Sequence, residues 1–391
     1  MFLVLLAQSS CLQLAQVFAF KSIGNITYQA KRKFSLIYQN YPTLLSLPTF
    51  YFNKMKFIDF NVKFSTKPFI QGRMNTLDIE KSQFQFFNDE VVKIESKNYQ
   101  QSIIQTHMCN VTIYKSNFVF CGDLDLFGVL EIEASDFKAT LCQFHMNFPD
   151  RGVLYMNGSV ASVTQCNFTS NIAASFGGAI HSSYSTIHSQ RCFYMYNHAE
   201  LSGGCILTEY SNLESLMDLF LFNSAGRSDS VICSSMDTSD LIRRSSFLFN
   251  DCEGLQQGVT VFFDCPNVIF EATRFVGNTR QSGLIPDASI MLRGKTSAYL
   301  RFCAFDCPIN MSVLLEADYD HQPMFNQTFC RVANHIPRSV RSILESSEDY
   351  LKKYQMDFSK IKSEKYLIAM GIAIPLLLLV TYVSILILVE K

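Results

Sequence analysis

The sequence predicts an all-β fold, a parallel β-helix (a solenoid) that continues into a C-terminal helical stalk and a single transmembrane helix. Three observations support this prediction. A short unit recurs through the middle of the chain every 24–28 residues, as the distances between successive repeat asparagines show. Each period has room for two or three short strands and none for a helix. Finally, residues 366–389 are apolar and carry no charge.

The composition excludes several classes of protein. In 391 residues, Lys+Arg is 33 and Asp+Glu is 34, which gives a net charge of -1. No strong field therefore steers the chain toward nucleic acid, and we expect no nucleic-acid partner. Charged residues amount to 17% and hydrophobic residues to 48%, a balance that excludes a wholly disordered chain.

The N-terminal end resembles a secretory signal. Residues 2–20 are apolar, and the small residue Ala19 offers a cleavage site, so we predict a signal peptide over 1–19. No Lys or Arg precedes the apolar run, and a buried first strand or a tail-anchored protein facing the cytosol are the alternatives. Residues 20–75 are rich in aromatic residues but irregular, and we interpret them as an N-terminal cap with degenerate coils.

The repeat defines residues 76–337 as the β-helix. Its unit is a small or Cys residue, a variable residue, an aromatic, two variable residues and then Asn. A second landmark, one or two glycines that open an apolar run, follows most of these asparagines. The clear copies place the structural repeat residues at Phe144, Asn147, Phe168, Asn171, Gly177, Gly178, Tyr194, Asn197, Gly203, Gly204, Phe220, Asn223, Phe247, Asn250, Phe275 and Asn278.

Stacking of coils at about 4.8 Å gives these residues a structural role. The aromatics are expected to form one internal column of offset-stacked rings. The asparagines are expected to form an external or turn ladder, with each amide bonded to the neighbouring coil. Leucine-rich repeats have a similar period, but they need several Leu in each unit, and this unit has a lone aromatic.

The C-terminal end predicts a membrane anchor. Residues 338–365 have apolar residues at helical spacing and are expected to form a juxtamembrane cap or stalk. Residues 366–389, at 1.5 Å per residue, span about 36 Å and so exceed a hydrocarbon core of about 30 Å. Only the tail 390–391 follows. Five lysines between 352 and 365 favour a cytoplasmic location for that side, but a signal peptide overrides this bias for a long translocated domain.

Cysteines and glycosylation acceptors point mildly to the cell exterior. The chain has 13 Cys, and removal of Cys11 with the signal leaves an even number. Cys142, Cys166 and Cys192 share one repeat position and are expected to be stacked buried thiols, with a disulfide between coils as the alternative. Cys303 and Cys307 are expected to form a local disulfide, with a redox pair as the alternative. The candidate acceptors are Asn25, Asn110, Asn157, Asn167, Asn310 and Asn326.

The motifs resemble a known family. Phe168 to Asn171, followed by Gly177 to Ile180, is similar to the paired FxxN and GGAI motifs of the polymorphic outer-membrane protein (Pmp) repeat, over about residues 77–310. That repeat occurs in chlamydial surface proteins and in protozoan surface proteins with one C-terminal membrane helix. The resemblance implies a right-handed β-helix displayed at the surface, with adhesion as its role. Most copies here lack the second Gly or the Ala, and no bacterial β-barrel follows.

Motifs for catalysis, cofactors and metals are absent from the sequence, which lacks GxGxxG, HExxH, GxSxG and CxxC patterns. We therefore predict no enzyme, no cofactor, no metal and no catalytic residue, and we interpret His181, His188 and His198 as surface or turn histidines. A polysaccharide-active β-helix enzyme is the alternative. Its candidate site residues come from two sets, Asp123, Asp125 and Asp136, or Asp318, Asp320 and His321.

Together these features predict a single-pass type I protein at the cell surface, anchored in the plasma membrane. Its solenoid would act as an adhesin or ligand-binding surface for an extracellular protein or glycan. Besides the enzyme, a structural coat protein without a specific ligand is an alternative.

Overall fold

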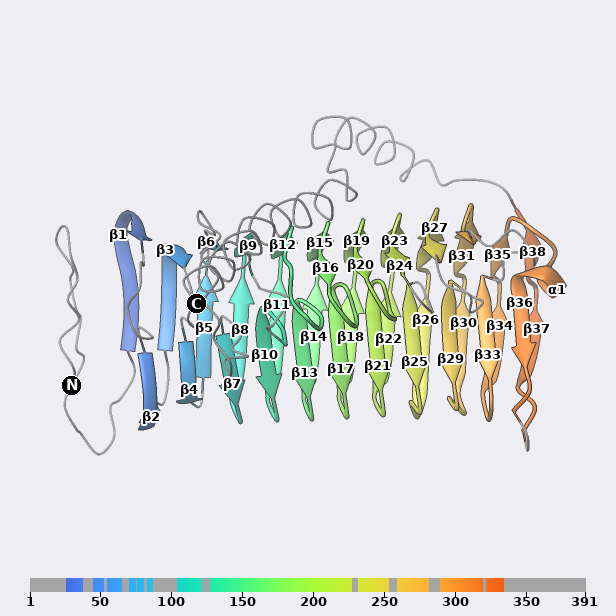
Figure 1. Ribbon diagram of the computed structural model, residues 1–391, viewed down its shortest axis with the longest axis horizontal. Helices are drawn as coiled ribbons and strands as arrows, with labels where there is room; N and C mark the ends of the chain where they lie inside the picture. Colours follow the sequence, from blue (N-terminus) through green and yellow to red (C-terminus); the bar gives the residue numbers. More distant parts are fainter. Residues whose placement is uncertain are drawn as a thin grey trace, which may run out of the picture. The chain divides into compact units, whose positions relative to one another are not determined.

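The chain winds into a parallel β-solenoid. The computed structural model describes the strands between residues 26 and 86, and residues 104–333 apart from 120, 122–126, 227–230, 253–258, 281–288 and 319–320. Strands of successive coils pair in parallel throughout this part, which confirms the all-β solenoid (Figure 1). The predicted signal peptide 1–19, stalk 338–365, transmembrane helix 366–389 and tail 390–391 lie outside the described residues. None of the helices that the structure describes has the length and apolar character needed to cross a bilayer.

One side of the coil is an 11-stranded parallel sheet, named sheet A here. Its strands, in spatial order, are β2 (Leu45–Phe52), β4 (Ile70–Met74), β7 (Ile104–His107), β10 (Leu130–Glu133), β13 (Leu154–Asn157), β17 (Ile180–Ser183), β21 (Ile206–Glu209), β25 (Ile232–Ser235), β29 (Thr260–Phe263), β33 (Ile290–Arg293) and β36 (Val313–Glu316). Short α1 (Ile309–Ser312) immediately precedes β36.

The next two sides belong to a 22-stranded sheet, sheet B, which forms two rows. The long strands β1 (Ile26–Ile37) and β3 (Met55–Phe64) pair with each other, and β3 pairs with both rows. The first row contains β5 (Thr76–Glu80), β8 (Asn110–Tyr114), β11 (Asp136–Thr140), β14 (Val160–Thr164), β18 (Thr186–Gln190), β22 (Asn212–Leu216), β26 (Ser239–Arg243), β30 (Val268–Glu271), β34 (Ser297–Arg301) and β37 (Met324–Thr328). The second row contains β6 (Gln83–Phe86), β9 (Asn117–Val119), β12 (Gln143–His145), β15 (Asn167–Thr169), β19 (Phe193–Met195), β23 (Leu219–Leu221), β27 (Ser246–Leu248), β31 (Arg274–Val276), β35 (Ala304–Phe305) and β38 (Arg331–Val332).

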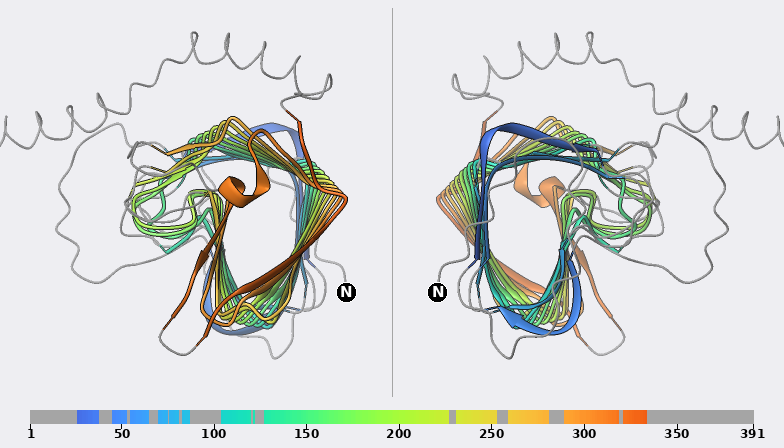
Figure 2. Two further views of the ribbon diagram at one scale, coloured as in Figure 1. Left: turned by 90° about the vertical axis from the view of Figure 1, so that its right-hand side faces the viewer. Right: turned by 90° about the vertical axis from the view of Figure 1, so that its left-hand side faces the viewer.

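A small third sheet, sheet C, continues five central coils. It consists of β16 (Ile172–Ala173), β20 (His198–Ala199), β24 (Ser224–Ala225), β28 (Asp251–Cys252) and β32 (Thr279–Arg280). The end-on views show the coils superimposed around one interior (Figure 2). Because strands β1 to β4 pair in parallel within residues 26–74, the region predicted as an N-terminal cap contains paired solenoid strands.

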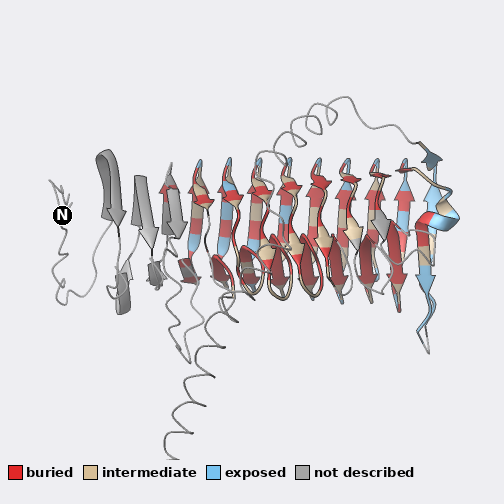
Figure 3. Ribbon diagram, turned by 45° about the horizontal axis from the view of Figure 1, so that its top comes forward, coloured by how far each residue is buried: buried red, intermediate tan, exposed pale blue. Residues whose placement is uncertain are grey.

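A column of aromatic rings runs through the interior. The structure places Phe144, Phe168, Tyr194, Phe220, Phe247 and Phe275 in one column, which Phe118 and Phe305 extend at its two ends. Their centroids lie 4.6–5.1 Å apart and neighbouring rings are nearly parallel. All of them are fully buried (Figure 3 shows the buried residues in red). Because the rung spacing matches the spacing of offset-stacked rings, one aromatic per coil forms a continuous stack in the core.

A column of asparagines runs beside the rings at the turn that follows the second row of sheet B, here called corner 3. Asn197 shows the pattern: its Nδ2 donates to the Phe168 carbonyl at 2.9 Å and to Asn223 Oδ1 at 3.0 Å. Its Oδ1 accepts from Asn171 Nδ2 at 2.8 Å. Asn147, Asn171, Asn223, Asn250 and Asn278 occupy equivalent positions, and all six are buried. The ladder therefore lies inside the turn and is not external, because its amides bond to backbone that solvent does not reach.

The paired glycines of the repeat allow backbones to come close together. Gly177 has a φ of +61°, which favours glycine. A Cβ added to Gly178 would lie 2.2 Å from the Gly204 carbonyl oxygen, so no side chain fits there. Both glycines come just before β17, where the chain enters sheet A.

Coil length varies in only part of the coil. From Leu130 to Asn147, from Leu154 to Asn171 and from Ile180 to Asn197, the number of residue positions is the same. The 24–28-residue spread of the repeat therefore arises mainly between the corner 3 asparagine and the next strand of sheet A.

No disulfide joins the cysteines whose side chains the structure describes. Cys142, Cys166 and Cys192 are stacked and buried, and the Sγ atoms of Cys142 and Cys166 bond to carbonyls two residues earlier, at Thr140 and Thr164. The predicted Cys303–Cys307 disulfide is wrong: Cys303 faces the interior and bonds to the Phe270 carbonyl, whereas Cys307 bonds to Ser312 Oγ.

Candidate functional site

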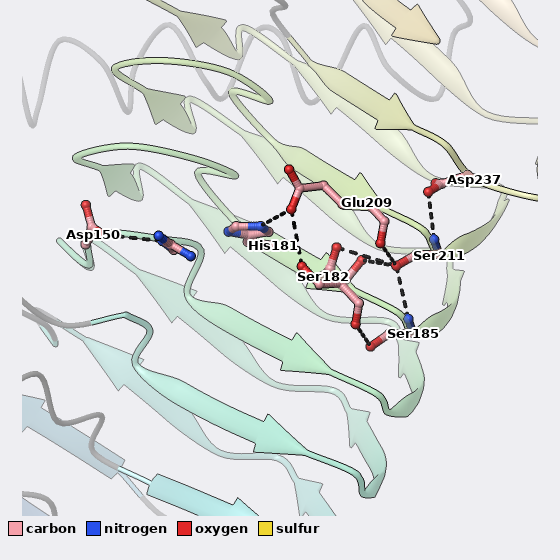
Figure 4. A network of polar contacts seen from close by, with 9 residues as sticks. Asp150, His181, Ser182, Ser185, Glu209, Ser211 and Asp237 are labelled. Carbon is pink, nitrogen blue, oxygen red and sulfur yellow. Dashed lines mark hydrogen bonds and ion pairs between the residues drawn. The ribbon is translucent and has the colours of Figure 1, made fainter. Parts of the chain in front are cut away.

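The outer face of sheet A gathers titratable side chains from several coils. Tyr155 and His181 are register neighbours on β13 and β17, and Glu209 lies one strand further on β21. Arg151 comes just before β13 and makes a bridge with Phe176 of the next coil. We call Arg151, Tyr155, His181 and Glu209 the His181 cluster; Figure 4 shows His181 beside Glu209.

His181 is the centre of this cluster. Tyr155 packs edge-on against its ring at 5.4 Å, and Phe176 does so at 5.9 Å. The Nε2 atom lies 3.6 Å from Glu209 Oε2. This distance is within the range of an ion pair but is too long for a hydrogen bond. Neither ring nitrogen has a hydrogen-bond partner among the described residues, and the residue is only 2% exposed. The expectation of a surface or turn histidine is therefore wrong for His181.

The other members of the cluster are accessible and differ in protonation. His181 lowers the pKa of Glu209, whose side chain is 46% exposed, so this carboxylate is ionised at neutral pH. Burial raises the pKa of Tyr155, against the opposite effect of Arg151, so the phenol keeps its proton. Arg151 lies over the Phe127 ring at 4.8 Å and 3.5 Å from Asp150 Oδ2. The cluster thus offers an ionised base, a neutral proton donor and a cation.

A strip of polar side chains runs along sheet A beside this cluster. It consists of the last residues of five successive strands, none of them buried: Glu133, Asn157, Ser183, Glu209 and Ser235. Ser183 Oγ donates to Glu209 Oε2 at 3.3 Å. We call these five residues the polar strip.

Two tyrosines border the polar strip at the turn between sheet A and the first row of sheet B, here called corner 1. Tyr184 and Tyr210 stack with centroids 5.0 Å apart and planes 7° apart. They are 65% and 50% exposed. Large aromatic surfaces that remain exposed next to hydrogen-bonding groups are typical of binding surfaces.

Three carboxyl groups lie in the interior, where no ligand reaches them. Asp218, Asp237 and Asp240 are almost fully buried, and burial raises the pKa of each, to about 7 for Asp218 and Asp237. Asp218 Oδ1 accepts from the Cys192 amide at 2.7 Å, and Ser215 Oγ donates to Oδ2 at 2.7 Å. These groups affect stability and not recognition.

The other residues considered from sequence are dispersed. His188 bonds to Glu214 at 2.7 Å on sheet B, and His198 bonds to Ser224 at 2.8 Å. Asp136 is exposed on β11, Asp318 and His321 form a bridge, and Asp123, Asp125 and Asp320 lie outside the described residues. Where the structure is described, no three His, Cys, Asp or Glu residues are placed to hold a metal ion. Asn110, Asn157, Asn310 and Asn326 are exposed, Asn167 is half-buried and Asn25 is not described.

The positions of Tyr155, His181 and Glu209 relative to the glycine landmark are the signal in the sequence that indicates the His181 cluster. Tyr155 and His181 each follow the two apolar residues after the glycine landmark, and Glu209 ends the equivalent strand of the next coil. Alignment of the coils on that landmark would have placed these side chains on one outer face.

Comparison with known proteins gives no family. No family model and no curated protein matches the chain. Among solved structures it is similar to a mutant of the periplasmic alginate epimerase AlgG, with 9% identity and a TM-score of 0.36 over 78% of each chain. It is also similar to a mutant tailspike protein of E. coli bacteriophage HK620 in complex with a pentasaccharide, with 13% identity and a TM-score of 0.32. That match covers 81% of this chain and spans 61% of the tailspike chain.

Proposed function

We propose that the protein binds an extended glycan along the outer face of sheet A. One observation carries this proposal: the polar strip repeats a hydrogen-bonding side chain on five successive strands, and the exposed Tyr184–Tyr210 pair borders it. Repetition at about 4.8 Å suits a repetitive ligand, which can bond to several rungs at once. Sugar hydroxyls bond to carboxylate, amide and hydroxyl groups, while the CH face of a sugar ring packs on an aromatic ring.

The test is a glycan array followed by calorimetry on the full chain. Ser183→Arg places a long side chain in the middle of the polar strip, and Ser162→Arg places the same side chain outside, on β14 of sheet B. We expect Ser183→Arg to weaken glycan binding by at least about ten-fold and Ser162→Arg to leave it unchanged. Equal binding by both variants, or no bound glycan on the array, contradicts the proposal.

A second candidate function is a polysaccharide-modifying enzyme, favoured by the His181 cluster. Glu209 supplies an ionised carboxylate as general base, Tyr155 a protonated phenol as general acid, and Arg151 a cation for an acidic group of a sugar. His181 is covered, so it acts as a positioning residue that holds Glu209 in its ionised form.

Glu214 offers a matched control for this activity, because it also pairs with a histidine but lies on sheet B. The full chain is incubated with neutral and acidic polysaccharides, and the products are followed by NMR and by release of reducing ends. If the chain is an enzyme, Glu209→Gln abolishes turnover and Glu214→Gln retains it. Turnover that survives in both variants places the chemistry elsewhere.

The location of the protein stays a proposal drawn from its sequence. A signal peptide over 1–19 and a transmembrane helix over 366–389 would display the solenoid at the cell surface as a type I protein, as in the surface proteins that carry the Pmp repeat. In that setting glycan binding would serve adhesion. Biotinylation of intact cells tests this arrangement: labelling is expected without permeabilisation, and labelling only after permeabilisation contradicts it.

A further inference from the structure

At corner 1, Gly158 contributes no side chain to a column of outward-pointing residues, and we call the space that it leaves the open step. In each coil, one residue at this corner takes the left-handed conformation and points outward. In order along the solenoid these residues are Met108, Ala134, Gly158, Tyr184, Tyr210, Met236, Asp264 and Gly294. Two of them, Gly158 and Gly294, have no side chain. A Cβ added to Gly294 would meet Asp264 of the preceding coil, whereas a Cβ added to Gly158 would meet no atom of the described residues within 4 Å.

The open step leaves one aromatic face uncovered. Tyr210 stacks against one face of Tyr184, and the opposite face looks toward the coil of Gly158, whose amide donates to the Ser183 carbonyl at 3.0 Å. Tyr184 is accordingly more exposed than Tyr210. Since tyrosine rings of adjacent coils lie 5.0 Å apart, one step of the column has the thickness of one stacked ring.

Polar and acidic groups surround the step. Asn157 precedes Gly158 and is exposed, and Val160, 50% exposed, lies on the other side. Glu133 and Asp136 are their register partners on the previous coil. Carboxylates accept hydrogen bonds from paired hydroxyl groups, but they repel an anion. The site therefore selects a neutral ring and disfavours a sugar acid.

We propose that the Gly158 step binds one neutral hexopyranose ring of the glycan, stacked on the free face of Tyr184. Asn157, Glu133 and Asp136 bond to its hydroxyls, and Val160 contacts its CH edge. This inference rests on the proposed glycan binding and specifies which ring of the ligand is held and where.

The chain itself supplies a substitution that fills the step. Gly158→Tyr needs a left-handed tyrosine, and Tyr184 and Tyr210 already take φ values of 50° and 52° at equivalent positions. The new ring has open space and can continue the stack, so the variant is expected to fold. Met236→Tyr is the matched control, because it lengthens the same stack at its other end.

The experiment uses the full chain made in a bacterial host without N-glycosylation, so that Asn157 carries no sugar. The probes are the neutral oligosaccharides that bind on the array. Gly158→Tyr is expected to reduce affinity at least about ten-fold, and Met236→Tyr to leave it within about two-fold. Circular dichroism and the melting temperature verify that both variants are folded.

The possible results separate the two proposals. If Ser183→Arg abolishes glycan binding and Gly158→Tyr leaves it unchanged, the glycan lies on the polar strip but no sugar ring binds in the open step. Tighter binding by Gly158→Tyr also overturns the step, since it means that the ligand lies on the outer edges of the rings. Preference for acidic over neutral oligosaccharides overturns the neutral-ring assignment, and binding of no glycan overturns both proposals.

Discussion

Corners 1 and 3 of the solenoid pair a left-handed residue with a hydrogen-bonding one that follows it. At corner 1, Tyr184 has a φ of 50°, and the following Ser185 donates from Oγ to the Ser183 carbonyl at 2.8 Å. The Ser185 amide donates in turn to Ser211 Oγ of the next coil at 3.0 Å. A left-handed non-glycine residue costs about 1–2 kcal/mol, and these buried bonds offset that cost. Small donors such as Ser and Cys therefore recur at the corners.

Asp218 occupies a position that Cys192 and Ser245 hold in the neighbouring coils, and it makes stability depend on pH. Its pKa is about 4 in an unfolded chain and about 7 in the fold, because burial disfavours the charge. Between these values the folded state holds a proton that the unfolded state has released, so stability falls as pH rises from about 4 to 7. At about 1.4 kcal/mol per pH unit, Asp218 alone lowers the free energy of unfolding by roughly 2–3 kcal/mol between pH 5 and 7.

Asp218→Asn removes this dependence while it keeps an acceptor for the Cys192 amide. We expect the variant to unfold at higher denaturant than the parent at pH 7.5, and at a similar concentration at pH 4.5. Asp136→Asn, at an exposed carboxyl, is the control and should behave as the parent. If the free energy of unfolding changes with pH equally in the parent and in Asp218→Asn, Asp218 is not the source of the pH dependence.

At the scale of the elements, sequence predicts what one coil repeats and misses what differs between coils. The column from Phe144 to Phe275 was predictable, because a constant spacing brings equivalent residues together whatever the details of the turns. The asparagine ladder was predictable as a turn feature, but its burial depends on backbone that closes over it. His181 and Glu209 come from different coils, and their contact depends on the register of sheet A, which the motif spacing alone does not state. The free Cys303 was missed because a short sequence separation does not reveal that one thiol faces inward.

The aromatic column offers a comparison within a single coil. Phe220 is fully buried between Tyr194 and Phe247, whereas Phe222 is half-buried and stacks on Tyr196 at the surface of corner 3. Phe220→Ala opens a cavity that the rigid stack cannot close, with an expected loss of about 3–5 kcal/mol. Phe222→Ala is expected to cost about 1 kcal/mol. Urea unfolding followed by circular dichroism measures both, and equal losses would place the column outside the core.

For the whole molecule, each coil pairs only with its two neighbours, so stability is a sum of coil and interface terms. The cysteines illustrate how this architecture protects reactive groups. Among the cysteines whose side chains are described, all but Cys307 and Cys330 are buried, and burial raises the pKa of Cys303 to about 12. A thiol with a raised pKa forms little thiolate and reacts slowly. The hydrogen bond with Cys166 lowers the pKa of Cys142, so this thiol is protected by its burial alone.

Alkylation of the native chain, mapped by mass spectrometry, tests the free thiols. Among the described cysteines, we expect rapid labelling of Cys307 and Cys330 and labelling of the others only in denaturant. Reduction before alkylation should change nothing. A pair of cysteines that is labelled only after reduction indicates a disulfide and contradicts the arrangement.

The uneven coil length has a practical consequence. Between each corner 3 asparagine and the next strand of sheet A, natural coils already differ in length while the three remaining sides keep their register. Foreign peptides grafted into that segment would project from one flank of the rod at regular intervals, with the opposite flank untouched. Epitopes or enzymes inserted into different coils would therefore be held at separations set by the number of coils between them.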